Sequence, residues 1–323
     1  MGSFLTTPKM SPALAARVEA SVRGRRHHPG GAAPRMVSLA RIGSLSAITL
    51  LIGSLVVSHY QEHQALERSR TALLDTVHAQ AASLGPEDVA FLARAESWLV
   101  RFSGAYEGDL VADDFSVAKA ARTILAKPAV YVRGPVAAFA TRAGIAEAAA
   151  ASRKDAFLLC LLDRPVSRAE KVLLSKVRTA YAGGPIVEER TANVRRLGDA
   201  VVGLPLLQPP WAARVQQAET AGDLAKLRKE LDKAPVEEAK RAAKSSLLVV
   251  AMDEPGAGTG PTELDGERPH EVRIALVDLA ASKVLLRMRK HVDPTWISMN
   301  ARAQYASGLD ACALALDVHE SVP

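Results

Sequence analysis

The stretch EVRIALVDLAASKVLLRMRKHV, residues 271–292, decides the fold class of this 323-residue chain. Two runs of aliphatic and β-branched residues, 272–278 and 283–289, flank the short connection 279–282. Apolar runs of this length, joined by so short a connection, predict a β-hairpin. The following residues, 296–318, place apolar side chains at helical spacing and predict a helix that closes the chain.

Three more short apolar runs precede the hairpin. They are AVYVR at 129–133, AFLLCLL at 156–162 and LLVVAM at 247–252. The first is β-branched and aromatic, and the other two are continuously apolar, as buried central strands are. Helical patterns lie between these runs, among them the alanine-rich residues 136–152 and a capping box that starts at Ser167. Strands interleaved with helices predict an α/β fold, with a mixed sheet of about five strands and covering helices.

The basic charge of the chain is confined to its N-terminus. The net charge is +6, and residues 1–41 alone hold seven Lys and Arg against one Glu. The rest of the chain is therefore electrically balanced, which argues against a nucleic-acid-binding surface. The sequence predicts a basic cytoplasmic tail over residues 1–35 and no nucleic-acid partner.

An uncharged segment follows the tail. Residues 42–58 carry no charge and would span about 25 Å as a helix, near the lower limit for a bilayer core. The positive-inside rule keeps the basic tail in the cytoplasm and exports the C-terminal part. We therefore expect a single-pass signal-anchor in the inner (cytoplasmic) membrane over 36–58, a helical stalk over 59–105 and a periplasmic α/β domain over 106–323. The residues expected to contact lipid or its interfaces are Arg41, Ile42, Leu50, Leu51, Leu55 and Tyr60.

A cleavable secretory signal is the alternative interpretation of this segment. The tail is much longer than the usual charged region of such a signal, and the nearest A-x-A triplet, Ala79 to Ala81, lies far beyond the apolar run. If translation starts at Met36, however, the same residues are typical of a secretory signal.

The residues HYQEH, from His59 to His63, match the H-x-x-E-H spacing of the inverted zinc peptidases. On a helix this spacing points both imidazoles toward one place, as a shared metal requires. A hydrolytic zinc also needs a third protein ligand and a substrate cleft. Because a polar stalk helix is predicted after His63, we favour histidines at a membrane interface and keep His59 and His63 as metal candidates. No cofactor is predicted.

Acidic residues follow several of the apolar runs. Asp163, Asp253 and Glu254 are the candidates for catalysis, because carboxylates at the ends of strands converge on a metal or substrate in an open α/β sheet. Aspartate before Arg-Pro or Glu-Pro also begins turns, and Asp278 fits a hairpin corner. The turn interpretation is favoured. The glycine-containing residues 253–269 predict a surface loop, since no helix follows to bind a phosphate.

The chain has two cysteines, Cys160 and Cys312. The first lies in a predicted strand and the second on the apolar stripe of the closing helix. An exported domain permits a disulfide between them if the two elements pack together. Two isolated buried thiols are the favoured interpretation, because both positions are typical of a core.

These patterns lead to three hypotheses of function. The preferred one is an anchored envelope protein whose exported domain is a non-catalytic binding or scaffolding module. Its partners are the lipid bilayer and an envelope protein, and a homo-oligomer is compatible with it. The second is a transmembrane regulatory protein with a tail helix, from Ser11, that contacts a cytosolic partner. The third is a membrane-bound, metal-dependent hydrolase. Deletion of residues 1–30 separates the first two hypotheses, and metal analysis of the purified protein tests the third.

Overall fold

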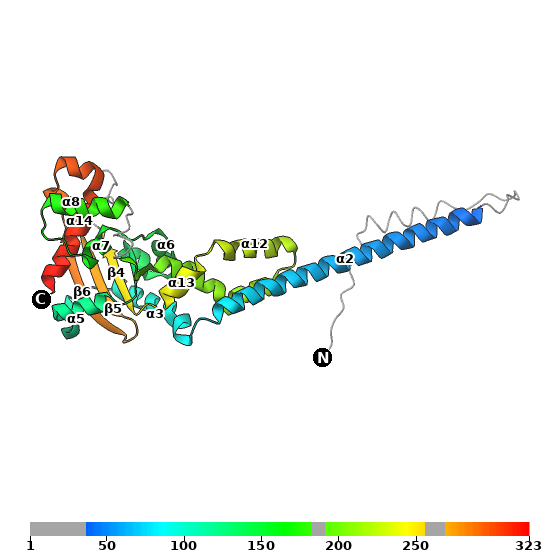
Figure 1. The fold of residues 1–323 in the computed structure, drawn as a ribbon, viewed down its shortest axis with the longest axis horizontal. Helices are drawn as coiled ribbons and strands as arrows, with labels where there is room; N and C mark the ends of the chain where they lie inside the picture. Colours follow the sequence, from blue (N-terminus) through cyan, green and yellow to red (C-terminus); the bar gives the residue numbers. More distant parts are fainter. Residues whose placement is uncertain (1–36, 183–190, 256–268, 323) are drawn as a thin grey trace. The chain divides into compact units, whose positions relative to one another are not determined.

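The computed structural model describes residues 37–182, 191–255 and 269–322. The contacts within the chain divide it into two units, Met1–His63 and Gln64–Pro323. The second unit holds a six-stranded mixed sheet with helices on both faces (Figure 1). The predicted α/β class, with a mixed sheet covered by helices, is confirmed.

The sheet has the strand order β1-β6-β5-β4-β2-β3. Its strands are β1 (Leu110–Val111), β2 (Ala129–Pro135), β3 (Val194–Arg196), β4 (Leu247–Asp253), β5 (His270–Asp278) and β6 (Lys283–Val292). β2 runs parallel to β3 and β4, and the remaining neighbours are antiparallel. The predicted hairpin is therefore β5 and β6.

A side chain at the hairpin corner explains why the chain reverses there. The carboxylate of Asp278 accepts the backbone N–H groups of Ala280 and Ala281 at 3.0 and 2.9 Å. Aspartate replaces a backbone acceptor in this way at many turns. The turn interpretation of Asp278 is confirmed.

The central strand β4 is buried on both faces, which explains its continuous run of apolar residues. Successive side chains of a strand point to opposite faces. Leu247, Val249 and Ala251 enter one core, whereas Leu248 and Val250 enter the other.

The first core lies between the sheet and the helices of one face. These helices are α4 (Asp113–Ser116), α5 (Ala118–Leu125), α7 (Ala156–Leu162), α8 (Glu170–Ala182) and α14 (Met299–Ser321), the last preceded by η3 (Pro294–Trp296). Phe157 and Tyr131 are fully buried here, with ring centroids 6.4 Å apart. The closing helix predicted over 296–318 corresponds to α14.

The second core lies on the opposite face of the sheet. Its helices are α3 (Pro86–Ser103), η1 (Val136–Ala140), α6 (Arg142–Ala151), α10 (Leu197–Gly203) and α13 (Val236–Ala243). Within α3, which the sequence assigns to the stalk, Phe91 and Leu99 are fully buried in this core. The N-cap of α3 is Gly85, whose N–H donates to Asp88 at 3.0 Å, and Pro86 occupies the first turn.

A third, smaller core joins the C-terminal part of α2 (Val37–Ala81) to η2 (Leu204–Leu207), α11 (Pro209–Gln217) and α12 (Ala221–Lys233). Leu73 and Val77 are its buried residues from α2, and Trp211 is its largest side chain from α11. Arg70 donates to the carbonyl oxygen of Ala218 at 2.6 Å. Residues 66–81 of α2 are thus part of the folded unit that contains the sheet.

Helix α10 packs so closely on α6 that one glycine has no room for a side chain. A Cβ at Gly198 would lie 2.3 Å from the carbonyl oxygen of Ala149. We expect Gly198→Ala to lower the free energy of unfolding by about 2 kcal/mol, because the two backbones must move apart. Gly222→Ala in α12 is the matched control, since its Cβ would meet Thr220 at an ordinary 3.6 Å and alanine favours a helix. Urea unfolding midpoints measure both changes, and equal midpoints for the two variants would contradict the expectation.

One predicted strand is wrong. Residues 156–162 form helix α7 and not a central strand. The side chain of Asp155 accepts the N–H of Leu158 at 3.0 Å and caps the helix. Six of the seven residues of α7 are buried, because the helix lies between the sheet and its neighbours α8 and α14. A short helix buried all round has the same continuous apolar run as a buried strand.

The favoured interpretation of the two cysteines is also wrong. Cys160 on α7 and Cys312 on α14 form a disulfide, with their Cα atoms 5.3 Å apart. Both residues are fully buried in the first core. Because residue 160 is on a helix that packs against α14, the two side chains face each other.

The anchor region is described only in part. Residues 1–35, the predicted cytoplasmic tail, lie outside the described residues, as do the side chains of Arg41, Ile42, Leu50, Leu51 and Leu55. Tyr60 is 63% exposed on α2. Within the described part of the chain, no helix combines the length and the hydropathy that crossing a bilayer requires.

Candidate functional site

The ends of β2, β4 and β5 meet in a network of charged side chains around Asp253. The guanidinium of Arg133 donates to its carboxylate at 2.8 and 3.2 Å, and the ring of His270 lies 3.2 Å from it. Burial by itself raises the pKa of Asp253, but the charge of Arg133 and the hydrogen bonds of His270 and Arg133 outweigh burial and lower it to about 2. Asp253 is therefore ionised at neutral pH and paired with the guanidinium of Arg133, as a structural carboxylate is.

The same arginine reaches a second acid. Arg133 lies 3.5 Å from Asp155, which also accepts the hydroxyl of Tyr131 at 2.8 Å. Burial, followed by the charge of Asp155, raises the pKa of Tyr131 well above its usual value. Asp155 also caps α7, so this network connects the sheet to the helix that carries Cys160.

Glu254 belongs to a different set of contacts. Its carboxylate accepts Arg273 at 2.5 Å and Arg289 at 2.7 Å, and it is only 13% exposed. These arginines stand directly opposite each other on β5 and β6. Like charges in such a pair repel, so Glu254 compensates a pair of cations.

Both arginines also hold the loop between α3 and β1, residues Gly104–Asp109, which we call the clamped loop. Arg273 donates to the carbonyl oxygen of Phe102 at 2.9 Å and to that of Gly104. The ring of Tyr106 lies near both Arg273 and Arg289, whose guanidinium carbons are 5.9 and 5.8 Å from its centroid. Both are cation–π distances to one ring.

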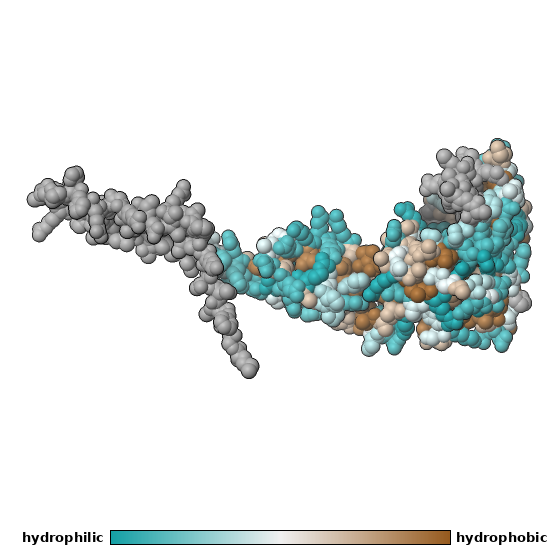
Figure 2. Space-filling model, turned by 180° about the vertical axis from the view of Figure 1, so that it is seen from behind, coloured by the Kyte–Doolittle hydropathy of each residue, from teal (hydrophilic) through white to brown (hydrophobic). Residues whose placement is uncertain are grey.

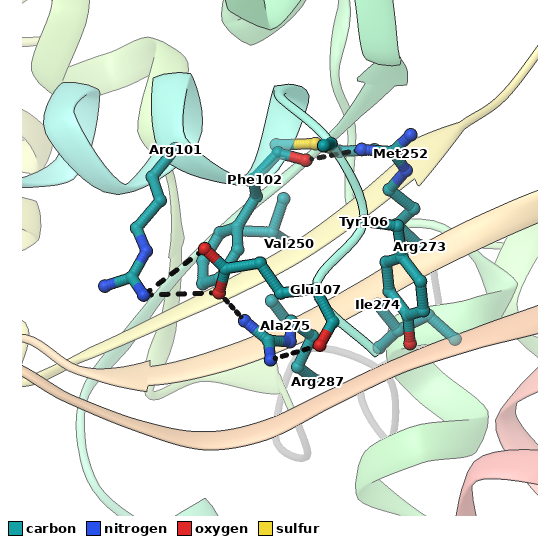
Figure 3. A pocket seen from close by; sticks show the side chains of 11 residues that line it. Arg101, Phe102, Tyr106, Glu107, Val250, Met252, Arg273, Ile274, Ala275 and Arg287 are labelled. Atoms are coloured by element: carbon teal, nitrogen blue, oxygen red, sulfur yellow. Dashed lines mark hydrogen bonds and ion pairs between the residues drawn. The ribbon is translucent and has the colours of Figure 1, made fainter. Parts of the chain in front are cut away.

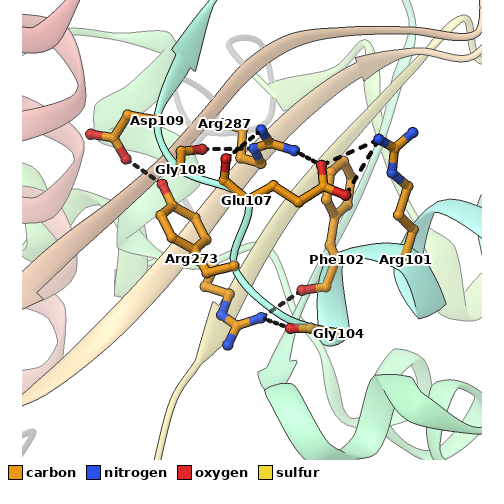
Figure 4. A network of polar contacts seen from close by, with 9 residues as sticks. Arg101, Phe102, Gly104, Glu107, Gly108, Asp109, Arg273 and Arg287 are labelled. Carbon is orange, nitrogen blue, oxygen red and sulfur yellow. Dashed lines mark hydrogen bonds and ion pairs between the residues drawn. The ribbon is translucent and has the colours of Figure 1, made fainter.

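Two further arginines bind the carboxylate of Glu107 in this loop. Glu107 lies between Arg101, at 3.2 Å, and Arg287 (Figure 4). Hydrogen bonds from Arg101 and Arg287 lower the pKa of Glu107. Arg287 also donates to the carbonyl oxygen of Gly108 at 2.8 Å. Tyr106 and Glu107, at the centre of the loop, therefore each contact two guanidinium groups.

Asp109 joins the end of the loop to strand β6. It accepts the backbone N–H of Arg289 at 3.1 Å and the hydroxyl of Tyr106. Burial and the adjacent carboxylate of Asp109 raise the pKa of Tyr106. The phenol therefore stays protonated and acts as a donor to Asp109.

A small cavity lies under the clamped loop (Figure 3). Val250, Met252 and Ala275 of the sheet contribute apolar side chains to it, and Phe102 of α3 does the same. The cavity is about 10 Å³, which is room for about one water molecule. Small-molecule sites are typically larger than about 300 Å³, so the described cavity does not hold a substrate of ordinary size.

The other sequence candidates lie apart from this network. Asp163 ends α7 and pairs with Lys176 of α8. His59 and His63 are exposed on α2. Among the described residues, no group of three or more His, Cys, Asp and Glu side chains is arranged to hold a metal ion. The glycine-containing stretch 256–268 lies outside the described residues.

No sequence motif marks Arg273, Arg287 and Arg289 as site residues, although the hairpin pattern itself places them together. All three share the sheet face of Ala275 and Val277. Arginines that cluster on one face of a hairpin require acids nearby. The sequence makes Glu254 a candidate for catalysis, and in the structure its carboxylate pairs with two of the arginines that hold the clamped loop.

Comparison of the chain with protein-family models, with curated proteins and with solved structures finds no match in any of the three.

Proposed function

We propose that the chain is a single-pass, membrane-anchored envelope protein whose exported α/β domain binds or scaffolds another envelope component without catalysis. The observation that carries the proposal is the disulfide between Cys160 and Cys312. Disulfides form and persist in oxidising compartments and are rare in the cytosol. The disulfide therefore supports export of the domain, and this support does not depend on the hydropathy of residues 42–58.

The N-terminal charge pattern supports the same topology. Seven basic residues precede the uncharged segment 42–58, so the positive-inside rule predicts that everything after it is exported. Tail and disulfide thus favour the same location for the domain.

The geometry of the candidate residues supports binding over catalysis. Asp253 and Glu254 are each held by arginine, and the described cavity holds about one water molecule. On the face drawn in Figure 2, hydrophilic residues predominate and hydrophobic residues form several separate patches. A surface of this kind suits a reversible protein partner more than an obligate one.

The redox state of the two thiols in cells tests the location. Cells are quenched in acid, denatured and treated with a maleimide-polyethylene glycol reagent before and after reduction. We expect no mass shift before reduction and two adducts after it, because the chain holds two cysteines in one disulfide.

The Cys160→Ala/Cys312→Ala variant is the control and should give no shift in either lane. Two adducts on wild-type protein before reduction would place the domain in a reducing compartment and remove the proposal. Alkaline phosphatase fused after Pro323 gives an independent readout, since it becomes active only outside the cytosol.

A further inference from the structure

We infer that the clamped loop, Gly104–Asp109, is a displaceable cover, and that the partner binds beneath it with a segment that carries an aromatic residue next to an acid. This inference rests on the proposed function, because it names where the exported domain binds its partner. It follows from what the loop covers, how the loop is held and which charges its removal would expose.

The loop covers apolar surface. Val250, Met252 and Ala275 belong to the second core and line the cavity under the loop. None of the six residues of the loop is itself buried. A polar segment thus lies over an apolar floor to which it contributes no buried side chain.

The contacts that hold the loop are polar and partly solvated. The side chain of Glu107 is 46% exposed, and those of Arg101 and Arg289 are 52% and 41% exposed, whereas those of Arg273 and Arg287 are only 16% and 13% exposed. The ion pair of Arg101 with Glu107, in which both side chains are exposed, stabilises weakly and is screened by salt. Gly108 has a φ of +90°, and Gly104 lies at the other end, so glycines flank the segment that holds Tyr106 and Glu107. Segments with few buried apolar contacts open at low free energy.

Displacement of the loop would leave a specific set of charges. Arg273 and Arg289 would keep Glu254, whereas Arg101 and Arg287 would lose the carboxylate of Glu107. The exposed rim would therefore carry excess positive charge beside an apolar floor. A partner segment with a carboxylate that binds Arg101 and Arg287 reproduces the contacts of Glu107. An aromatic ring beside that carboxylate, placed against Arg273 and Arg289, reproduces those of Tyr106.

The loop sequence itself supplies the probe. A fluorescein-labelled peptide SGAYEGD, residues 103–109, is titrated into the full chain in detergent micelles and followed by anisotropy. We expect saturable binding to Tyr106→Ser/Glu107→Ser that is at least tenfold tighter than binding to wild type. The wild-type loop competes intramolecularly at high effective concentration, on the order of millimolar.

Two controls test the chemistry of recognition. A peptide with Gln for its Glu and Ser for its Tyr should lose at least tenfold in affinity. Addition of Arg287→Gln to the double variant should weaken the binding of the original peptide to a similar extent. Equal binding to wild type and variant, no binding to a variant with a wild-type circular dichroism spectrum, or indifference to the control peptide would each overturn the inference.

If the double variant does not fold, hydrogen exchange on the wild-type chain tests whether the clamped loop opens separately from the sheet. Amides of residues 104–109 should exchange at least tenfold faster than those of β4, and faster still when salt is added. Exchange of the loop only together with β4 would show that it opens by global unfolding and would overturn the inference. Thiol trapping reports export independently, so the proposed function can fail or stand apart from this result.

Discussion

Replacement of Arg133 by alanine is expected to lower the free energy of unfolding at neutral pH by about 3 kcal/mol, the lower end for a broken buried ion pair. The side chain is only 15% exposed and serves both Asp253, at 2.8 Å, and Asp155, at 3.5 Å. Its removal leaves two carboxylates 28% and 26% exposed without their shared guanidinium. Thermal or urea unfolding of the full chain, followed by near-ultraviolet circular dichroism, measures the change.

Arg142→Ala is the matched control for this substitution. Arg142 is 80% exposed and pairs with Glu96 at 3.2 Å, so its loss should cost no more than about 1 kcal/mol. A similar loss for the two variants would show that the network around Asp253 has no special role in stability.

The pH dependence of this difference follows from the pKa of Asp253. In the folded wild type that pKa is about 2, below the ordinary value of 3.8. A lowered carboxyl pKa stabilises the fold above about pH 4, and this stabilisation is lost as the pH falls toward 2. We therefore expect the gap between wild type and Arg133→Ala to be largest at neutral pH and to narrow on acidification over that interval.

Removal of the disulfide by Cys160→Ala/Cys312→Ala is expected to lower the free energy of unfolding by about 3 to 5 kcal/mol. The disulfide joins residues 152 apart in sequence, so it closes a long loop in the unfolded chain. It also ties α7 to α14 across the first core. The unfolding midpoint of the purified chain measures the loss.

Reductant provides the control for this second substitution. The midpoint of wild type should fall toward that of the double variant once both thiols are reduced, whereas the midpoint of the variant should not move. A wild-type midpoint unchanged after complete reduction, verified by thiol titration, would contradict the expected contribution of the disulfide.

Local sequence patterns determined several parts of this protein. The hairpin of β5 and β6 could be predicted because short apolar runs joined by a four-residue connection have few other stable arrangements. β2 could be predicted because a β-branched and aromatic run bounded by turn residues favours a strand, and β4 because its short run is continuously apolar. The confinement of net charge to residues 1–41 is likewise a property of the sequence alone.

Only the tertiary structure decided the remainder. β1 and β3 have two and three residues, too few for any periodicity, and exist because longer strands β6 and β2 offer them partners. Residues 156–162 form a helix that is surrounded by apolar neighbours, and burial on all sides hides the helical period of the sequence.

The disulfide and the clamped loop depend on residues that are distant in the chain. Cys160 meets Cys312 only because two helices pack together, and Glu107 meets Arg287 only because strand β6 lies beside the loop. The sequence determined which groups are charged, apolar or able to form a disulfide. Their pairing was decided by packing, because contacts between residues more than 100 positions apart leave no mark on local spacing.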